Sequence, residues 1–202
     1  MKVFCIGRNY VNHAKELNNP VPNKPLVFMK PTSALVRKGK DVYYPEFTKE
    51  MHYEAEIVLR ICKNGRHIEE KFAHKYFDAI TIGIDFTARD VQRECKAKGH
   101  PWEIAKGFDD SAPIGQFIEL SEVDLNAIQF HLTQNGKTVQ DGNTKDLIFP
   151  FANLISYLSK YFRIQTGDLI FTGTPAGVGA TQIGDHLEGF IEGKKLLNCN
   201  VK

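Results

Sequence analysis

The clearest strand pattern in the chain reads Glu54-Ala55-Glu56-Ile57-Val58-Leu59-Arg60-Ile61. Apolar residues occupy positions 55, 57, 59 and 61, and the alternate positions hold two glutamates, a valine and an arginine. Successive side chains of a strand point to opposite faces, so this period of two residues predicts a half-buried β-strand. One face would pack on the core, and the other would carry both glutamates.

Further strand-like runs lie on both sides of this segment. They are residues 2–6, 26–30, 79–86, 128–134, 137–140 and 168–172. Asn135-Gly136 separates two of these runs and is the strongest short hairpin signal that a sequence offers. Glu192-Gly193 predicts a second hairpin near the C-terminus.

Helical patterns are fewer than strand patterns. We expect helices at residues 10–17, 69–77, 88–98 and 150–161, with Gly99 and Pro101 ending the third and Pro150 in the first turn of the fourth. Because strands predominate and hairpins join many of them, the sequence predicts a mixed, largely antiparallel α+β fold rather than a doubly wound one. The 202 residues, 42% of them hydrophobic, are enough for a single domain, 1–202, with a sizeable core.

Charge and cysteine usage exclude several classes of protein. The net charge is +2 and the basic residues are spread along the chain, so we expect neither a nucleic-acid nor a membrane partner. The four cysteines are far apart in sequence, which excludes a local zinc or redox motif and argues against a disulfide framework. No apolar run approaches the ~20 residues of a membrane span, and none at the N-terminus resembles a signal peptide. We therefore expect a cytoplasmic protein.

Two glutamates at positions i and i+2 of one strand are suited to hold a cation. Their Cα atoms are roughly 6.5–7 Å apart at a rise of ~3.3 Å per residue, and two buried like charges need a positive partner. Asp85, at the end of an apolar run, is a possible third ligand. Oxygen ligands favour Mg²⁺, or Mn²⁺. Taken alone, Glu54 and Glu56 are more simply the solvated face of an edge strand, and Asp85 is more simply a helix cap.

Several longer motifs occur in one order along the chain. They are Gly7-Arg8-Asn9-Tyr10 with His13 and Glu16, Lys30-Pro31, His52-Tyr53-Glu54-Ala55-Glu56, Asp85-Phe86-Thr87-Ala88-Arg89-Asp90-Val91-Gln92, Pro101-Trp102 with Lys106, and Thr172-Gly173-Thr174-Pro175-Ala176-Gly177-Val178-Gly179. In these motifs the chain resembles the fumarylacetoacetate hydrolase family, in its short branch of acylpyruvases and oxaloacetate decarboxylases. The resemblance implies a rolled β core with peripheral helices, and a homodimer.

The resemblance also implies a role for each motif residue. Glu54, Glu56 and Asp85 would bind the metal, and His13 with Glu16 would position and deprotonate water. Lys106 would take part in catalysis, and the residues facing the substrate would be Arg8, Arg89, Gln92 and Thr174. Without the resemblance, the His13–Glu16 pair is more simply a surface ion pair, and the glycines from 173 to 179 a turn with positive φ.

These residues suit the cleavage of a C–C bond in a small 2-oxo acid. The substrate's keto and carboxylate oxygens would fill open metal positions, and the metal would stabilise the enolate left by bond cleavage. Three carboxylates around a divalent cation carry a formal charge of −1, so Lys106 and Arg89 are expected to supply positive charge. Acylpyruvate hydrolysis and oxaloacetate decarboxylation both fit.

Two other functions remain open from the sequence. One is an isomerase or tautomerase of a 2-hydroxy-dienoate or of oxaloacetate, and the other is a metal- or ligand-binding module without turnover. Residues 8–25 are a candidate lid over the bound substrate.

Overall fold

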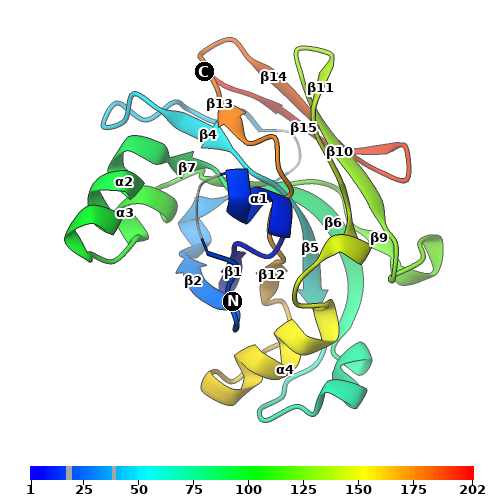
Figure 1. Ribbon diagram of the computed structural model, residues 1–202. Coiled ribbons are helices and arrows are strands. Elements are labelled where there is room, and N and C mark those ends of the chain that lie inside the picture. Colours follow the sequence, from blue (N-terminus) through cyan, green and yellow to red (C-terminus); the bar gives the residue numbers. More distant parts are fainter. Residues whose placement is uncertain (17–19, 38–39) are drawn as a thin grey trace.

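The largest sheet contains eight strands, and the predicted metal ligands Glu54, Glu56 and Asp85 lie on or beside two strands near its centre. The structure, a computed structural model, describes residues 1–16, 20–37 and 40–202 (Figure 1). The strand order is β2-β1-β12-β5-β6-β8-β3, and β9 pairs with β6. Among the described strands of this sheet, β1–β12 and β3–β8 pair in parallel, and the other neighbours are antiparallel. The strands are β1 (Val3–Gly7), β2 (Leu26–Lys30), β3 (Leu35–Arg37), β5 (Ala55–Ile61), β6 (Phe77–Ile84), β8 (Ala112–Ile114), β9 (Ile118–Glu119) and β12 (Leu169–Phe171).

Two smaller antiparallel sheets complete the β structure. Their orders are β11-β10-β14-β15 and β13-β4-β7. Both predicted hairpins are confirmed: Asn135 and Gly136 join β10 to β11, and Glu192 and Gly193 join β14 to β15, all four with positive φ. The strands are β4 (Met51–Tyr53), β7 (Thr87–Ala88), β10 (Gln129–Gln134), β11 (Lys137–Asn143), β13 (Gly179–Ala180), β14 (His186–Ile191) and β15 (Lys194–Asn200).

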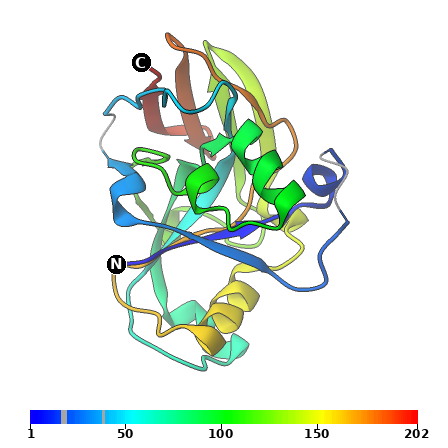
Figure 2. The ribbon, with the colours of Figure 1, turned by 90° about the vertical axis from the view of Figure 1, so that its left-hand side faces the viewer.

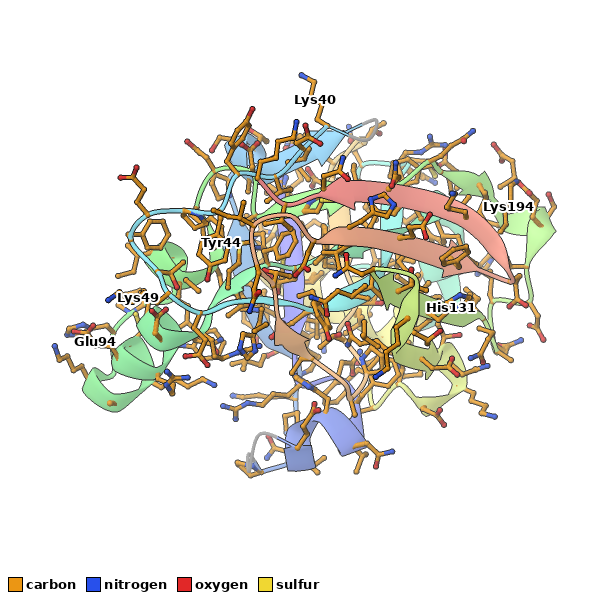
Figure 3. The ribbon with its side chains drawn as sticks, turned by 90° about the horizontal axis from the view of Figure 1, so that it is seen from above. Lys40, Tyr44, Lys49, Glu94, His131 and Lys194 are labelled. Atoms are coloured by element: carbon orange, nitrogen blue, oxygen red, sulfur yellow. The ribbon has the colours of Figure 1, made fainter. Side chains whose placement is uncertain are left out.

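The main core lies between the large sheet and the four-stranded sheet, which curls over it (Figure 1). Gly189 of β14 sits directly over Ile82 of β6, where an added Cβ would come within 2.9 Å of the Ile82 Cγ2 atom. On the other side of the four-stranded sheet, His131 stacks on Phe190 with ring centroids 4.5 Å apart (Figure 3). The predicted rolled, largely antiparallel core is therefore confirmed.

The helices lie at the periphery. The α-helices are α1 (Val11–Glu16), α2 (Arg89–Lys98), α3 (Glu103–Lys106) and α4 (Phe151–Tyr161), and the 3₁₀ turns are η1 (Thr32–Ala34), η2 (Glu70–Lys75), η3 (Leu120–Glu122) and η4 (Thr144–Asp146). Helices α2 and α3, green in Figure 2, lie side by side on one flank. As predicted, α2 ends at Gly99, which has the left-handed φ of 67° that favours glycine. Leu17, the predicted last residue of the first helix, lies outside the described residues.

Two local predictions were wrong. The expected helix at 69–77 is only the 3₁₀ turn η2, because Phe77 pairs with Ile61 and begins β6 with its side chain in the core. The strand β5 is not half-buried: it lies between β12 and β6, and Val58 on its second face packs in a smaller apolar cluster with Phe171. The prediction of alternation was correct, but both faces are covered.

Two compositional expectations can be compared with the fold. All four cysteines are free thiols, in agreement with the absence of a disulfide framework. Among the described helices, none is long and apolar enough to cross a membrane.

Candidate active site

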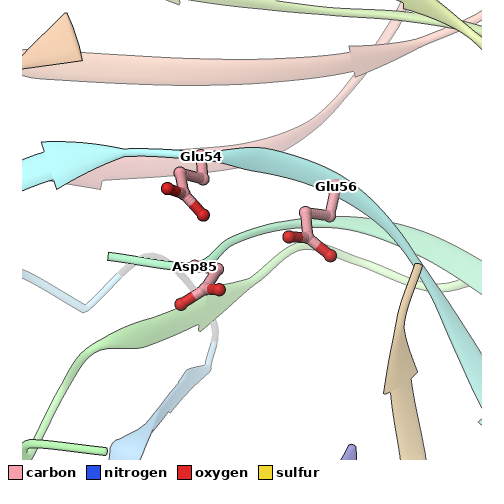
Figure 4. A group of neighbouring side chains, drawn as sticks. All are labelled: Glu54, Glu56 and Asp85. Atoms are coloured by element: carbon pink, nitrogen blue, oxygen red, sulfur yellow. The ribbon is translucent and has the colours of Figure 1, made fainter. Parts of the chain in front are cut away.

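Three carboxylates meet at one end of the β5–β6 pair. Glu54 precedes β5, Glu56 lies in it, and Asp85 follows β6 directly. The Asp85 amide donates to the Glu54 carbonyl at 2.8 Å, which extends the ladder and brings the side chains together. One oxygen of each carboxylate lies within 4.8 Å of the others (Figure 4), and all three residues are at most 5% exposed. The two alternative interpretations from the sequence are therefore wrong. Glu54 and Glu56 do not lie on the solvated face of an edge strand, and Asp85 does not cap α2, whose N-cap is Ala88.

Two of the carboxylates have cationic partners. Lys106 Nζ lies 2.8 Å from Glu54 Oε2 and 2.7 Å from Asp85 Oδ2, and Arg89 Nη2 binds the other Glu54 oxygen. Burial opposes the ionisation of Glu54, but Lys106 and Arg89 outweigh it and hold the pKa of Glu54 well below its usual range. Burial likewise lowers the pKa of Lys106, and the two carboxylates more than offset this, so the pKa is raised. Lys106 and Arg89 therefore supply positive charge beside the carboxylates, as predicted from the sequence.

A third cation was not anticipated. Lys30 Nζ, fully buried, lies 2.9 Å from Asp85 Oδ1. It also donates to the carbonyls of Phe86, Lys106 and Ser111 and to the Ser111 hydroxyl. Lys30 on β2 therefore contacts the segment of Asp85 and Phe86, the end of α3 at Lys106, and Ser111 before β8. Its motif was recognised in the sequence without a role, because only the tertiary fold brings these carbonyls to β2.

The third carboxylate, Glu56, has no ion-pair partner among the described residues. Its Oε2 accepts a 2.6 Å hydrogen bond from the Gly173 amide. Burial, and then the nearby Asp85 carboxylate, raise the pKa of Glu56 well above its usual range. Asp85 Oδ1 is buried and accepts no well-aligned hydrogen bond, despite its proximity to Lys30. A buried, all-oxygen set with one uncompensated carboxylate and one under-satisfied oxygen fits a divalent cation of the Mg²⁺ type.

His13 and Glu16 form the predicted pair across one turn of α1. His13 Nδ1 lies 3.3 Å from Glu16 Oε2, with His13 buried and Glu16 partly exposed. Burial lowers the pKa of His13 below its ordinary value, although Glu54 and Glu16 act in the opposite direction. Glu16 therefore favours the charged ring, as expected, but burial outweighs it and keeps the imidazole neutral at pH 7.

The glycine-rich run holds two of these acids through its backbone. Gly173 and Gly177 have φ of 105° and 97°, and a Cβ on Gly177 would lie 2.4 Å from the Val139 carbonyl oxygen. The Gly177 amide donates to Glu16 Oε1 at 2.9 Å, as that of Gly173 does to Glu56. The prediction of a turn with positive φ is confirmed, and the turn also positions carboxylates.

The remaining candidate residues line one pocket with the carboxylates. Figure 1 shows that they come from distant parts of the chain: β1, the start of α1, β5, α2, α3 and the segment after β12. The predicted residues along this pocket are Arg8, His13, Glu54, Glu56, Arg89, Gln92, Lys106 and Thr174. Asp85 borders it through Lys106. Their contacts with substrate stay predictions. The proposed lid, residues 8–25, falls partly outside the described residues.

Side-chain contacts fix the polar groups that face this pocket. Arg89 Nη1 donates to Gln92 Oε1 at 2.8 Å, one helical turn along α2. Thr174 Oγ1 accepts a 2.8 Å hydrogen bond from Gln140 Nε2, which leaves the threonine proton free to donate into the pocket. Gln140, in β11, also accepts from the Ala55 amide between the two glutamates. No sequence signal pointed to Gln140, because its role depends on a contact between separate sheets.

Sequence reasoning also missed two residues at the pocket mouth. Trp102 and Lys96 both line the pocket, with Lys96 Nζ 5.4 Å from the centroid of a Trp102 ring. Lys96 follows Arg89 and Gln92 at i+7 and i+4 on α2, so helical periodicity could have identified it.

Comparison with known proteins gives matches along nearly the whole chain. Residues 2–202 match the family profile described as "Fumarylacetoacetate (FAA) hydrolase C-terminal". The mouse (Mus musculus) protein named "Oxaloacetate tautomerase FAHD1, mitochondrial" is 39% identical over 201 residues, covering 99% of this chain and 91% of the relative. The Dictyostelium discoideum protein named "Oxaloacetate decarboxylase, mitochondrial" is 40% identical over 194 residues, covering 95% of this chain and 89% of the relative.

A solved structure agrees equally well. The crystal structure of fumarylpyruvate hydrolase from Pseudomonas aeruginosa in complex with Mn²⁺ and pyruvate has a TM-score of 0.94 and 38% identity to this chain. The match covers 100% of this chain and 89% of that one. The sequence motifs and the three-dimensional fold therefore lead to the same group of proteins.

Proposed function

The chain belongs to the fumarylacetoacetate hydrolase family, and we propose that it is a divalent-metal-dependent enzyme that cleaves a C–C bond in a small 2-oxo acid. The reaction is acylpyruvate hydrolysis, oxaloacetate decarboxylation or both. The observation that carries the proposal is the buried carboxylate triad, which adjoins a pocket lined by cations and by a neutral histidine. A binding module without turnover would not need that histidine.

Glu54, Glu56 and Asp85 would hold the metal, which we propose to be Mg²⁺ or Mn²⁺. Their oxygen-only ligand set and the Mn²⁺ named for the P. aeruginosa relative support this choice. When bound, the cation supplies a Lewis acid that draws electron density from the substrate's keto oxygen.

The substrate's 2-oxo carboxylate would lie against the groups that point into the pocket. Arg89 is held by Glu54 and Gln92, so its guanidinium is oriented before substrate arrives. Thr174, which lines the same pocket, donates a hydrogen bond to the substrate, because its own oxygen already accepts one from Gln140. Lys106 keeps its charge in the buried site and stabilises negative charge that develops on the substrate during bond cleavage.

His13 is the general base of the hydrolytic reaction. Its Nδ1 faces the Glu16 carboxylate, which can only accept hydrogen bonds, so the neutral ring keeps its proton on Nδ1. The lone pair on Nε2 is then available to remove a proton from water. Glu16, itself fixed by the Gly177 amide, orients the ring and stabilises it once it becomes charged.

An assay panel on metal-stripped protein tests the proposal. Acetylpyruvate cleavage, oxaloacetate decarboxylation and oxaloacetate enol–keto conversion are followed with and without added Mg²⁺ or Mn²⁺. We expect metal-dependent turnover of at least one substrate. Turnover that is the same with and without added metal would refute the mechanism. Tight metal binding without turnover of any of the substrates would favour a binding module.

A second candidate function is tautomerisation of oxaloacetate, which the name of the mouse relative favours. It would use the same metal and pass through the same enolate, but no water would attack and His13 would not be required as a base. His13→Asn separates the two functions. Acylpyruvate hydrolysis should collapse in this variant, whereas metal-assisted decarboxylation or tautomerisation survives in part.

Three broader expectations accompany this proposal. Residues 1–202 act as one catalytic domain, and two copies form a homodimer, which light scattering would detect. A cytoplasmic location stays a prediction, because the mouse and Dictyostelium relatives carry the word mitochondrial in their names. Fractionation of cells that produce the full-length protein would test it.

A further inference from the structure

Lys96 stands at the mouth of the active-site pocket without an acidic partner. It is accessible to solvent, lines the pocket together with Arg8 and Arg89, and forms no ion pair among the described residues. The acids that line the pocket are Glu54 and Glu56, both at its buried end. The Lys96 amine is therefore surrounded by positive rather than negative charge on the side that faces the pocket.

The helix α2 directs Lys96 into this position. Arg89, Gln92 and Lys96 follow one another at i, i+3 and i+7, so they share one face of α2, and all three line the pocket. Trp102, on the loop before α3, lies beside the lysine, with Lys96 Nζ 5.4 Å from the centroid of a Trp102 ring. The side chain is thus held at the pocket and does not extend freely into solvent.

These surroundings weaken the hold of Lys96 on its proton. Partial burial lowers the pKa of Lys96 most, and repulsion from Arg8, Arg89 and, less strongly, Lys106 lowers it further against a smaller attraction from Glu54, so that the pKa is about 8. About a tenth of the side chains are then neutral at pH 7, against fewer than about one in a thousand for an ordinary lysine. A neutral amine is a nucleophile, and desolvation and neighbouring cations are the means by which lysines are activated in proteins.

We infer that Lys96 is a carbamylation site, at which carbon dioxide adds reversibly to the side-chain amine. The amine nitrogen forms a bond to the carbon of CO₂, one C–O π bond breaks to leave a negatively charged oxygen, and the nitrogen releases a proton to water. No oxidant, reductant or further reactant takes part. The product is a planar carbamate with a charge of −1 in the place of an ammonium with a charge of +1.

Arg8 is suited to hold this carbamate. It is half-buried at the pocket and has no ion-pair partner among the described residues, whereas Arg89 is already held by Glu54 and Gln92. A guanidinium offers a planar fork that matches two oxygens of a planar anion. Arg8 also has a left-handed backbone with φ of 60°, which a non-glycine residue adopts rarely and mostly at functional positions. The cation that repels the Lys96 ammonium therefore attracts the carbamate, and both effects favour the modification.

Carbamylation has a consequence for the anionic substrates of the proposed function. It replaces a positive charge at the pocket mouth by a negative one and pairs it with Arg8, so the field that draws an anion towards the pocket becomes weaker. This consequence rests on the proposed function. The modification itself does not, because CO₂ can be supplied from solution and no turnover is required.

Chemical trapping followed by peptide mass spectrometry locates the modification. The Mg²⁺-loaded full chain is equilibrated with CO₂ at pH 7.5, and carbamates are alkylated with a triethyloxonium salt before digestion. We expect at least about tenfold more trapped group on Lys96 than on Lys98 of the same helix, because Lys98 projects from another face with Glu94, and this ion pair raises the pKa of Lys98 (Figure 3). At a constant concentration of dissolved CO₂, the occupancy of Lys96 should rise from pH 6.5 to 8.5, because the amine loses its proton over this range.

A pair of arginine variants tests the role of Arg8. Arg8→Met should lower the occupancy of Lys96 severalfold, because it removes both the repulsion of the ammonium and the partner of the carbamate. Arg93→Met on α2, where Arg93 is exposed and pairs with Glu50, should leave the occupancy unchanged. A peptide with a free α-amino group, trapped in the same solution, is the positive control. No trapped group on Lys96 while the peptide is modified would overturn the inference, and so would equal occupancy of Lys96 and Lys98.

Steady-state kinetics separates this inference from the proposed function. Added CO₂ should raise KM for acetylpyruvate about threefold or more in the unchanged protein, and it should have no effect in Lys96→Arg, which keeps the charge and stays protonated. Equal inhibition of both proteins would assign the effect to bicarbonate at the metal and would overturn the consequence for substrate binding. If Lys96 is trapped but no 2-oxo acid is turned over, the proposed function is wrong and the carbamylation site stands.

Discussion

Replacing Lys30 with methionine should destabilise the protein strongly, because Lys30 joins three segments around the triad. Methionine keeps most of the apolar stem and removes only the charge and the donors. The variant loses the 2.9 Å ion pair with Asp85 and the hydrogen bonds to Phe86, Lys106 and Ser111. Lys106 would then be the remaining described cation beside Asp85.

The expected loss of unfolding free energy is about 4 kcal/mol. Removing one partner of a buried ion pair costs about 3–5 kcal/mol, because the other charge stays buried. Lys106 still compensates Asp85 in part, which lowers this figure, whereas the loss of the Lys30 donor from the Phe86 carbonyl adds about 1 kcal/mol or more. The Lys106 and Ser111 carbonyls still accept from the Ser111 hydroxyl and the Phe86 amide. For a chain of 202 residues this corresponds to a fall in Tm of roughly 10 °C.

Urea and thermal unfolding measure the effect with and without Mg²⁺. The loss should be larger in the metal-stripped protein, because a bound cation compensates the Asp85 charge in place of Lys30. Lys137→Met, at an exposed hairpin position, is the matched control and should change stability by less than about 0.5 kcal/mol. A loss below about 1 kcal/mol in Lys30→Met without metal would refute the assignment of Lys30 as the counter-ion of Asp85.

Three further predictions concern the site. Glu56→Gln should abolish metal-dependent activity while the Tm of the metal-stripped protein stays the same or rises, because Glu56 has no cationic partner in the part of the chain that the structure describes. A clear fall in Tm would contradict this. The acid limb of the kcat/KM profile should lie below pH 6.5, since the lowered pKa of His13 keeps the neutral base available until the pH falls through that value; a limb above pH 7 would argue against His13 as the base. Gly177→Ala should lower stability by about 2–3 kcal/mol and reduce kcat, because a Cβ would meet the Val139 carbonyl and displace the amide that holds Glu16; chemical denaturation and steady-state kinetics measure both effects.

The sequence predicted those parts of the site that depend on local spacing. Glu54 and Glu56 share a face because they are two residues apart in a strand, and His13 meets Glu16 because they are three apart in a helix. Asp85 was noticed because a charge ends an apolar run. Each of these inferences needs only the geometry of one element, and each placement agrees with the structure.

The missed features depend on contacts between elements. Lys30 acquires its role from carbonyls in segments more than 50 residues away, and Gln140 from a strand in another sheet. The half-buried reading of β5 failed for the same reason, since a cover for its second face cannot be read from the strand alone. Lys96 is different, because its i+7 spacing from Arg89 can be read from the sequence. It was missed because Lys96 lies in none of the sequence motifs that identified the other pocket residues.

The charges explain why the site suits a dianionic substrate. The expectation from sequence was a metal-loaded site of formal charge −1, compensated by two nearby cations. The structure adds Lys30, so the formal charges of three carboxylates and three cations cancel before metal binds, although the cations pair with Glu54 and Asp85 and leave Glu56 without one among the described residues. A divalent cation then brings the formal charge to +2. A substrate with one carboxylate neutralises half of this excess, whereas a substrate with two carboxylates neutralises all of it. Buried charge is favourable only when it is compensated, so the same three cations that allow the metal-free protein to fold also favour the doubly charged substrate.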